Sequence, residues 1–105
     1  MSGRIAQQSP FLKLLYDCSP TQRKALIESA SREQLEALSQ IALNILRGNL
    51  SVSETHKKKL KEYKDVIRSL GSRSVSLTRK KNALLNFHSL LPLLVKPVLY
   101  LLDES

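Results

Sequence analysis

The basic side chains are the residues of this sequence best suited to chemistry, and most of them lie close together. Residues 56–81, HKKKLKEYKDVIRSLGSRSVSLTRKK, hold ten of the seventeen Lys and Arg side chains in the 105-residue chain. The formal net charge of the whole chain is +8. Because ten basic side chains against three acidic ones lie in residues 51–81, about a third of the chain, the charge favours a polyanionic partner over a role in solubility alone.

On a helix, part of this basic stretch would form a stripe. Four basic residues in 52–70 follow the spacing i, i+4, i+7, i+11, which makes a line about 16 Å long on one helix face. Like charges in a line repel each other, and a polyanion lying along them would remove that cost. The alternative is an ordinary solvated helix face. The expected phosphate contacts are Lys57, Lys61, Lys64 and Arg68, with Lys58, Lys59, Arg73, Arg79, Lys80 and Lys81 at the margins.

The segment after residue 70 offers two further interpretations. Arg79, Asn82 and Asn86 follow helical spacing, and Arg and Asn are base-edge readers in a major groove. Contact with phosphates alone is the simpler alternative. A helix-turn-helix regulator with 52–70 in the major groove is a third reading, although lysines suit phosphates better than base edges. The serines of SRSVS would serve turns and capping, or carry phosphate groups that offset the charge.

Other kinds of site find no support in the sequence. Cys18 is the single cysteine, which fits a reducing compartment and a small, partly buried side chain. His56 and His88 lie far apart, with no cysteine or carboxylate at metal-ligand spacing. There is no glycine-rich phosphate loop and no arrangement that suggests a catalytic triad. We therefore expect a non-enzymatic protein without metal or cofactor, in the nucleus, a virion or the cytoplasm.

The elements that must position these residues are helices. Leu dominates the apolar residues, and Gly and Pro are few. Helix-start signals at Ser9, Ser19, Ser31, Ser51 and Ser76, and helix stops at Gly48 and Gly71, predict five helices. Their expected ranges are 10–17, 20–29, 32–47, 52–70 and 77–90. The predicted fold is a single all-α domain over 1–105, a compact four- to five-helix bundle with a Leu/Pro-rich C-terminal segment and a basic region at 52–81.

The apolar C-terminal segment, 84–102, has three interpretations. From Leu90 to Leu102 it is largely apolar and interrupted by Pro92, Lys96 and Pro97. It is too short for a membrane span, which needs about 20 residues, so membrane contact is the least favoured. It could instead fold over the open side of the bundle. It could also dock another protein chain, such as a capsid or host protein, or a second copy of this chain.

The order of these motifs resembles a known group. LKLLYDCSPTQRKALIESAS, then ALNILRGNLSVSETHKKKLKEYKDVIRSLGSRSVSLTRKKNALL, then a Leu/Pro-rich tail are similar to small basic proteins encoded by polinton-like and adintovirus-like mobile elements. The resemblance covers about residues 11–102. One difference is that LLNFHSLLPLL stands where the group often has a Gly-Gly-Phe stretch, which puts proteolytic processing in question for this chain.

The resemblance implies a double-stranded DNA element that has a capsid. A small basic product of such an element would accompany packaged DNA in the virion core. The function expected from residues and resemblance together is sequence-tolerant DNA binding through phosphates, with affinity from counterion release. The alternative is an adaptor that binds a capsid or host protein through Leu90–Leu102.

Overall fold

The structure is a computed structural model that describes the backbone of residues 3–104 and the side chains of residues 3–102. Within that range the chain forms eight helices and no strand, which confirms the all-α prediction but corrects the expected four to five helices. The body is nearly round, with principal axes of 29, 27 and 25 Å. The helices are α1 (Gly3–Gln7), α2 (Ser9–Asp17), α3 (Pro20–Glu28), α4 (Arg32–Leu46), α5 (Glu54–Lys61), α6 (Lys64–Gly71), α7 (Leu77–Asn86) and α8 (Leu90–Glu104).

Three helices begin at the serines that the sequence indicates. Ser19 and Ser31 each form a complete capping box with the Gln three residues later. In each box the serine Oγ accepts the backbone N–H of the Gln, and the Gln side chain accepts the N–H of the serine. Ser76 caps α7 by accepting the backbone N–H of Arg79. These caps satisfy N–H groups that have no partner inside their own helix.

Two predicted caps are wrong. Ser53, not Ser51, caps α5, and its Oγ accepts the backbone N–H of His56. Val52 packs against the core from the loop, which keeps the chain extended until Ser53. Ser9 is already the first residue of α2. The short helix α1 before it was not predicted, and its fully buried Ile5 anchors it in the core.

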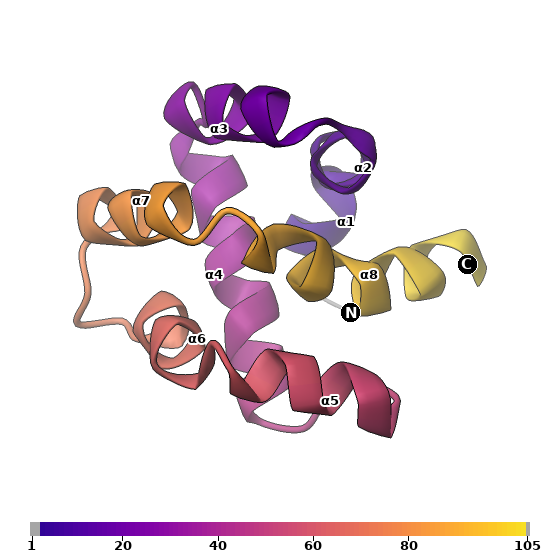
Figure 1. Cartoon of the computed structure of the whole chain (residues 1–105). Helices are drawn as coiled ribbons and strands as arrows, with labels where there is room; N and C mark the ends of the chain where they lie inside the picture. The colour runs from indigo at the N-terminus through magenta and orange to yellow at the C-terminus, as the bar shows by residue number, and fades with distance from the viewer. Residues whose placement is uncertain (1–2, 105) are drawn as a thin grey trace.

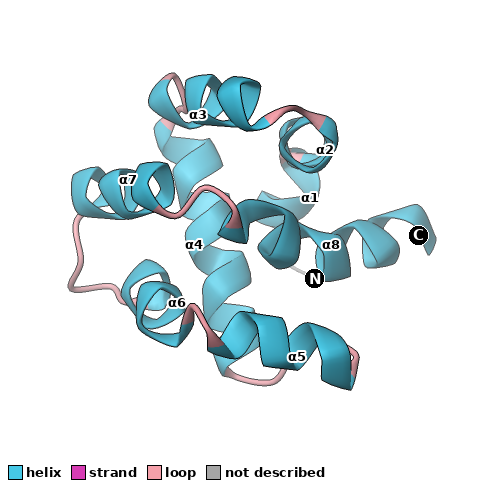
Figure 2. Cartoon of the chain, viewed as in Figure 1, coloured by secondary structure: helices cyan, strands magenta, loops and turns pink. Residues whose placement is uncertain are grey.

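The single helix expected over 52–70 is two helices, α5 and α6. The backbone N–H of Tyr63 donates to the carbonyl of Leu60 at 2.9 Å, a short-range bond of the kind that tightens and ends a helix. Neither Gly nor Pro lies at the break. Instead the two helices have different partners, because α5 packs against α8 whereas α6 packs against α4 and α7. Figure 1 shows α5 lengthwise and α6 nearly end on, and Figure 2 shows the turn between them.

Tyr63 anchors this break to the start of α8. Its hydroxyl lies 3.0 Å from the Oγ of Ser89, just before α8. Its ring meets the ring of Phe87 edge to face, with 6.5 Å between centroids, a favourable aromatic geometry. The position of the turn is therefore set by contacts with a distant part of the chain, which helical periodicity alone does not predict.

Both glycines that were expected to end helices do lie at helix ends, for different reasons. Gly48 follows the C-cap of α4 and has a φ of 72°, a left-handed conformation that favours glycine. Gly71 is the last residue of α6 and packs against α4. A Cβ at Gly71 would lie 2.9 Å from Leu46 Cδ1 and 3.3 Å from Leu43 Cα. The absence of a side chain there lets α6 approach the backbone of α4.

The apolar tail is the centre of the core. α8 runs between α2 and α5 and also contacts α4 (Figure 1). Five of its side chains have no solvent exposure at all. These are Leu90, Leu91, Leu94, Val95 and Val98. The tail therefore folds over the body of the bundle, and membrane contact and docking are not needed to explain its apolar residues.

Pro97 lies inside α8 and leaves a backbone carbonyl without its helical donor. Proline has no N–H, so the carbonyl of Leu93, four residues earlier, receives no bond from it. The Nε2 of His56 lies 2.7 Å from that oxygen. Because a carbonyl only accepts, Nε2 must carry the proton and donate. The His56 side chain, only 9 % exposed, thus replaces the missing backbone donor and ties α5 to α8.

Pro92 lies in the first turn of α8, where its missing N–H removes no helical hydrogen bond. The carbonyl four residues earlier belongs to His88, and it accepts a long bond of 3.5 Å from Nη1 of the buried Arg23. The backbone N–H of Leu91 also donates to it at 3.1 Å. A second long bond, 3.4 Å from Nη2 to the carbonyl of Cys18, joins Arg23 to the end of α2. Arg23 therefore holds α2 and α3 against the start of α8.

Candidate nucleic-acid interface

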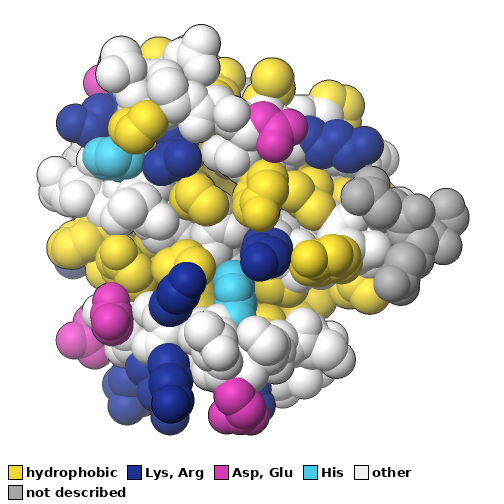
Figure 3. All heavy atoms as spheres, turned by 45° about the vertical axis from the view of Figure 1, so that its right-hand side comes forward, with side chains coloured by type: hydrophobic (Ala, Val, Ile, Leu, Met, Phe, Trp, Pro, Cys, Tyr) yellow, Lys and Arg dark blue, Asp and Glu magenta, His cyan; other side chains and the backbone are white. Residues whose placement is uncertain are grey.

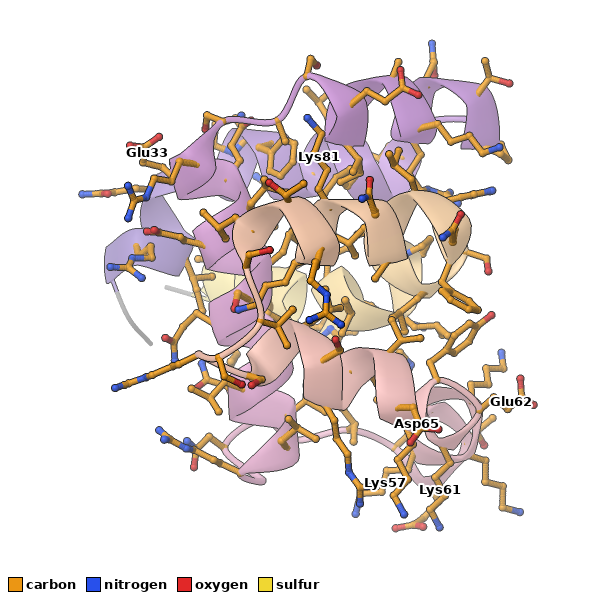
Figure 4. All side chains as sticks on the ribbon, turned by 90° about the vertical axis from the view of Figure 1, so that its left-hand side faces the viewer. Glu33, Lys57, Lys61, Glu62, Asp65 and Lys81 are labelled. Atoms are coloured by element: carbon orange, nitrogen blue, oxygen red, sulfur yellow. The ribbon has the colours of Figure 1, made fainter. Side chains whose placement is uncertain are left out.

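The predicted phosphate contacts on α5 and α6 all have exposed side chains. Figure 3 shows Lys and Arg side chains gathered at the bottom of the molecule, over α5. In Figure 4 the labelled Lys57 and Lys61 point away from the body. We name this surface the α5–α6 corner. Its basic residues are Lys57, Lys58, Lys59, Lys61, Lys64 and Arg68.

Three carboxylates share the α5–α6 corner. The Nζ of Lys57 lies 3.6 Å from Oε1 of Glu54, and both side chains are well exposed. Such a solvated pair is weak and easily exchanged for another anion. Glu62, in the turn, and Asp65, in the first turn of α6, are also exposed. The corner therefore keeps an excess of positive charge, although less than its six cations suggest.

The continuous stripe predicted for this region is not present. Because α5 ends at Lys61 and α6 begins at Lys64, the row divides into two pairs. Lys57 and Lys61 lie four residues apart on α5, and Lys64 and Arg68 lie four apart on α6. Each pair spans about 6 Å along its helix. The recognition helix that a helix-turn-helix reading requires over 52–70 is interrupted at the same place.

Lys80 does not extend the basic surface, which corrects its assignment to the margin of the patch. Its side chain is only 6 % exposed, and its Nζ donates to Ser39 Oγ at 2.7 Å. Ser39 in turn donates to the carbonyl of Leu70 near the end of α6, at 2.6 Å. Burial lowers the pKa of Lys80, and the nearby carboxylate of Glu36 opposes that change. Lys80 thus joins α7 to α4 and, through Ser39, to α6.

Of the remaining marginal residues, Lys81 lies away from the corner. α7 lies between α3 and α6 (Figures 1 and 4). Lys81 is half-buried, and Figure 4 shows it toward α3, at the end of the molecule opposite Lys57 and Lys61. Arg73, in the loop between α6 and α7, and Arg79 on α7 are exposed. Lys80, which is buried, and Lys81, at the opposite end of the molecule, therefore lie apart from the corner, where six of the ten predicted contacts are.

The proposed base readers form an exposed row on α7. Arg79, Asn82 and Asn86 are all exposed, as their spacing predicts. None of them has a buried structural role in the described part of the chain. Sequence readout by this row stays a prediction.

A second surface, which sequence reasoning did not resolve, lies where α8 meets α2 and α5. Two adjacent hollows of about 350 and 190 Å³ share Lys96 and Tyr100 in their walls. Tyr100 is 62 % exposed and Leu101 42 % exposed, so the outer side of α8 remains partly apolar. Hydrophobic side chains run across this face in Figure 3. Helical periodicity could have separated Tyr100 from the buried positions, had α8 been expected to be a helix, whereas Leu101 follows Leu94 by seven residues and shares the buried face.

Neither a metal centre nor a membrane span emerges from the described residues. No group of three or more His, Cys, Asp or Glu side chains among them could hold a metal ion. No single helix in this part of the chain has the length and hydropathy to cross a membrane. Only α7 and Leu90–Leu102 together meet that test, and they are bent by 106°.

Comparison with known proteins finds no matching protein-family model, no matching curated protein and no matching solved structure.

Proposed function

We propose that this is a non-enzymatic protein that binds nucleic acid, with DNA favoured, through the phosphates of its backbone. The observation that carries the proposal is the α5–α6 corner. Six cations on two consecutive helices are exposed there, whereas the buried basic side chains elsewhere, Arg23 and Lys80, are bound within the fold. Exposed Lys and Arg side chains on a convex corner suit phosphate contact, which needs no pocket.

The bend between α5 and α6 determines how such contacts would be made. Lys57 and Lys61 would follow one run of phosphates, and Lys64 and Arg68 would reach another across the turn. Glu54, Glu62 and Asp65 lie among these cations, so the corner favours a dense polyanion over a single anionic group. Sequence-tolerant binding follows, because these contacts do not read base edges.

A titration across salt concentration tests this proposal. If four to six phosphates are neutralised, log K for a short DNA duplex falls with log salt at a slope of about −4 to −5. Single-stranded DNA and heparin, titrated in parallel, separate duplex recognition from attraction to charge alone. A Lys24→Gln variant on α3, far from the corner in Figure 1, is the matched control and should bind as the wild type does. Absence of duplex binding at about 50 mM salt would contradict the proposal.

The resemblance to products of polinton-like and adintovirus-like elements suggests where this activity would be used. A small protein with a basic corner would suit the packaged DNA of a virion core, or viral DNA in the nucleus. Detecting the protein with DNA inside purified particles would test this setting. Finding it only in DNA-free particles or only in the cytoplasm would contradict it.

A second candidate function is supported by the outer side of α8. Tyr100 and Leu101 are large, exposed and apolar, and two hollows flank Lys96 and Tyr100. Exposed aromatic residues beside hollows are typical anchors of protein interfaces. In this reading the protein is an adaptor that binds a capsid or host protein. The test is binding of the capsid protein of the same element to the wild type and to Tyr100→Ser/Leu101→Ser, since loss in the variant alone would favour the adaptor.

A further inference from the structure

A third surface feature, separate from the α5–α6 corner and from α8, brings together basic residues that are far apart in the sequence. It is a hollow of about 350 Å³ between α1, α4, the α6–α7 loop and α7. Its charged lining consists of four cations and one carboxylate, which leaves an excess of three positive charges. These residues are Arg4, Arg32, Arg73, Lys80 and Glu36.

The single carboxylate holds two of these cations at one wall of the hollow. Glu36 Oε1 accepts from Nε of Arg32 at 2.9 Å, and Glu36 Oε2 lies 3.6 Å from Nη1 of Arg4. The bond from Arg32 lowers the pKa of Glu36, so the carboxyl group stays ionised at neutral pH. A guanidinium has five N–H donors, and these contacts engage one nitrogen of each arginine. This wall of the hollow therefore has two arginines, held by Glu36, whose other N–H groups can donate to a ligand.

Lys80 supplies a buried positive charge to the same hollow. Its ammonium group has three donors, and Ser39 Oγ accepts one of them at 2.7 Å. A buried cation is costly unless an anion lies near it. Arg73, exposed on the α6–α7 loop, faces the hollow as part of its lining. Three arginines and a lysine with donors left over in the lining of one hollow are well suited to a phosphate-bearing ligand.

We infer that this hollow is a binding site for a small phosphorylated molecule, in particular one with a diphosphate group. The volume accommodates a diphosphate with part of a further substituent. The excess of three positive charges matches a multiply charged anion better than a carboxylate. Bidentate contact from arginine forks would give orientation, and Lys80 would add a point charge at the base. The site is independent of the nucleic-acid surface, since it shares no residue with the corner.

Titration of the whole chain with inorganic pyrophosphate, at constant ionic strength, tests the site. We expect changes in the backbone amide signals of Ser39, Gln40 and Gly71, which line the hollow, and an increase in the melting temperature. Sulfate at equal ionic strength should produce much smaller changes. A parallel titration with ADP shows whether the site accepts a nucleoside. Tighter binding of ADP than of pyrophosphate would mean that the nucleoside adds to the affinity.

Three single variants separate this site from general attraction to charge. Arg73→Gln, in an exposed loop, should weaken pyrophosphate binding about tenfold. Lys80→Met keeps the aliphatic stem in place and should weaken it similarly. Lys61→Gln, at the α5–α6 corner, should leave it within about twofold while it weakens duplex binding. Three results would each overturn the inference. The first is an equal loss of pyrophosphate binding in Lys61→Gln and Arg73→Gln, and the second is equal binding of sulfate and pyrophosphate. The third is a DNA duplex that changes the amide signals of the hollow at a lower concentration than those of α5.

Discussion

Two stretches of this sequence resemble interaction surfaces equally well, but the fold uses them in opposite ways. The apolar tail becomes α8, and five of its side chains are completely buried in the core. The basic stretch becomes α5 and α6, and six of its cations remain exposed at the corner. Burial of the apolar run stabilises the core, whereas burial of these six charged side chains would be costly. The comparison teaches that an unusual stretch indicates a partner only after the needs of the core are met.

The buried polar residues complete this contrast. His56 donates to the carbonyl of Leu93, which lacks its helical donor because of Pro97, and Arg23 donates to the carbonyls of His88 and Cys18. Lys80 binds Ser39, whose hydroxyl donates to a carbonyl near the end of α6. All three are therefore bound, directly or through a hydroxyl, to backbone carbonyls outside their own helices. Their basic character serves the fold.

The largest expected effect is on stability and tests the burial of α8. Leu94→Ala should reduce the free energy of unfolding by about 2–5 kcal/mol, because Leu94 is fully buried and its removal leaves a cavity. Leu101→Ala, two turns later on the same face but 42 % exposed near the end of α8, should reduce it clearly less, because less apolar surface is lost from the core. Urea denaturation followed by circular dichroism measures both. Equal effects would mean that α8 is not packed as the structure shows.

The next effect concerns the link between His56 and Pro97. His56→Leu should cost about 1–3 kcal/mol, because it leaves the Leu93 carbonyl without a donor. Pro97→Ala supplies a backbone N–H to that same carbonyl, so His56→Leu should cost clearly less in the Pro97→Ala background. Unfolding free energies of the four proteins give the coupling directly. Lys57→Ala, at the exposed neighbouring position, serves as the control, and strict additivity of the two changes would disprove the link.

These links show where sequence reasoning succeeded and where it could not. Caps at Ser19, Ser31 and Ser76 depend on residues three positions away, so local sequence predicted them. The all-helical class followed from composition for a similar reason. The break before Tyr63 depends instead on contacts with Phe87 and Ser89, more than twenty residues later. No local pattern contains that information.

The candidate site followed the same rule. Exposure of the six corner cations followed from the buried side of the same helices, which periodicity identifies. Lys80 lies three residues after Leu77 and four before Leu84, so helical periodicity places it on the apolar face of α7 and its burial was predictable. Its partner Ser39, forty-one residues away, was not. The hollow that joins Arg4 and Arg32 to Arg73 was likewise missed, because its lining comes from distant segments. The sequence shows only that these residues and Lys80 are basic, and it does not show that they lie together.

A third prediction tests the corner against the buried cation. Lys61→Gln/Lys64→Gln should reduce the magnitude of the salt slope for duplex binding by about 2, because two phosphate contacts are lost. The melting temperature should hardly change, since both side chains are exposed. Lys80→Met should show the reverse pattern, with duplex binding and its slope unchanged. Its stability should equal or exceed that of the wild type, because burial penalises the charged form of Lys80. If Lys80→Met lost duplex binding while folded, the corner would not be the interface.

The smallest effect is the pH dependence contributed by Glu36, which separates the hollow from the corner. The hydrogen bond from Arg32 lowers the pKa of Glu36 in the folded chain, and the charges of Arg4 and Lys80 act in the same direction. A lowered folded pKa means that the stabilisation is present above the unfolded pKa and is lost as pH falls through the folded one. Glu36→Gln should therefore lower the melting temperature at pH 7, by at most about 4 °C for exposed pairs of this kind. The difference from wild type should vanish at low pH, where the carboxyl group is protonated in both states.

Glu54→Gln, which removes a carboxylate from the weak pair with Lys57 at the corner, is the matched control. If both variants behaved alike across pH, the arginines at the hollow would be held no better than the lysines at the corner, and the distinction between the two surfaces would fail.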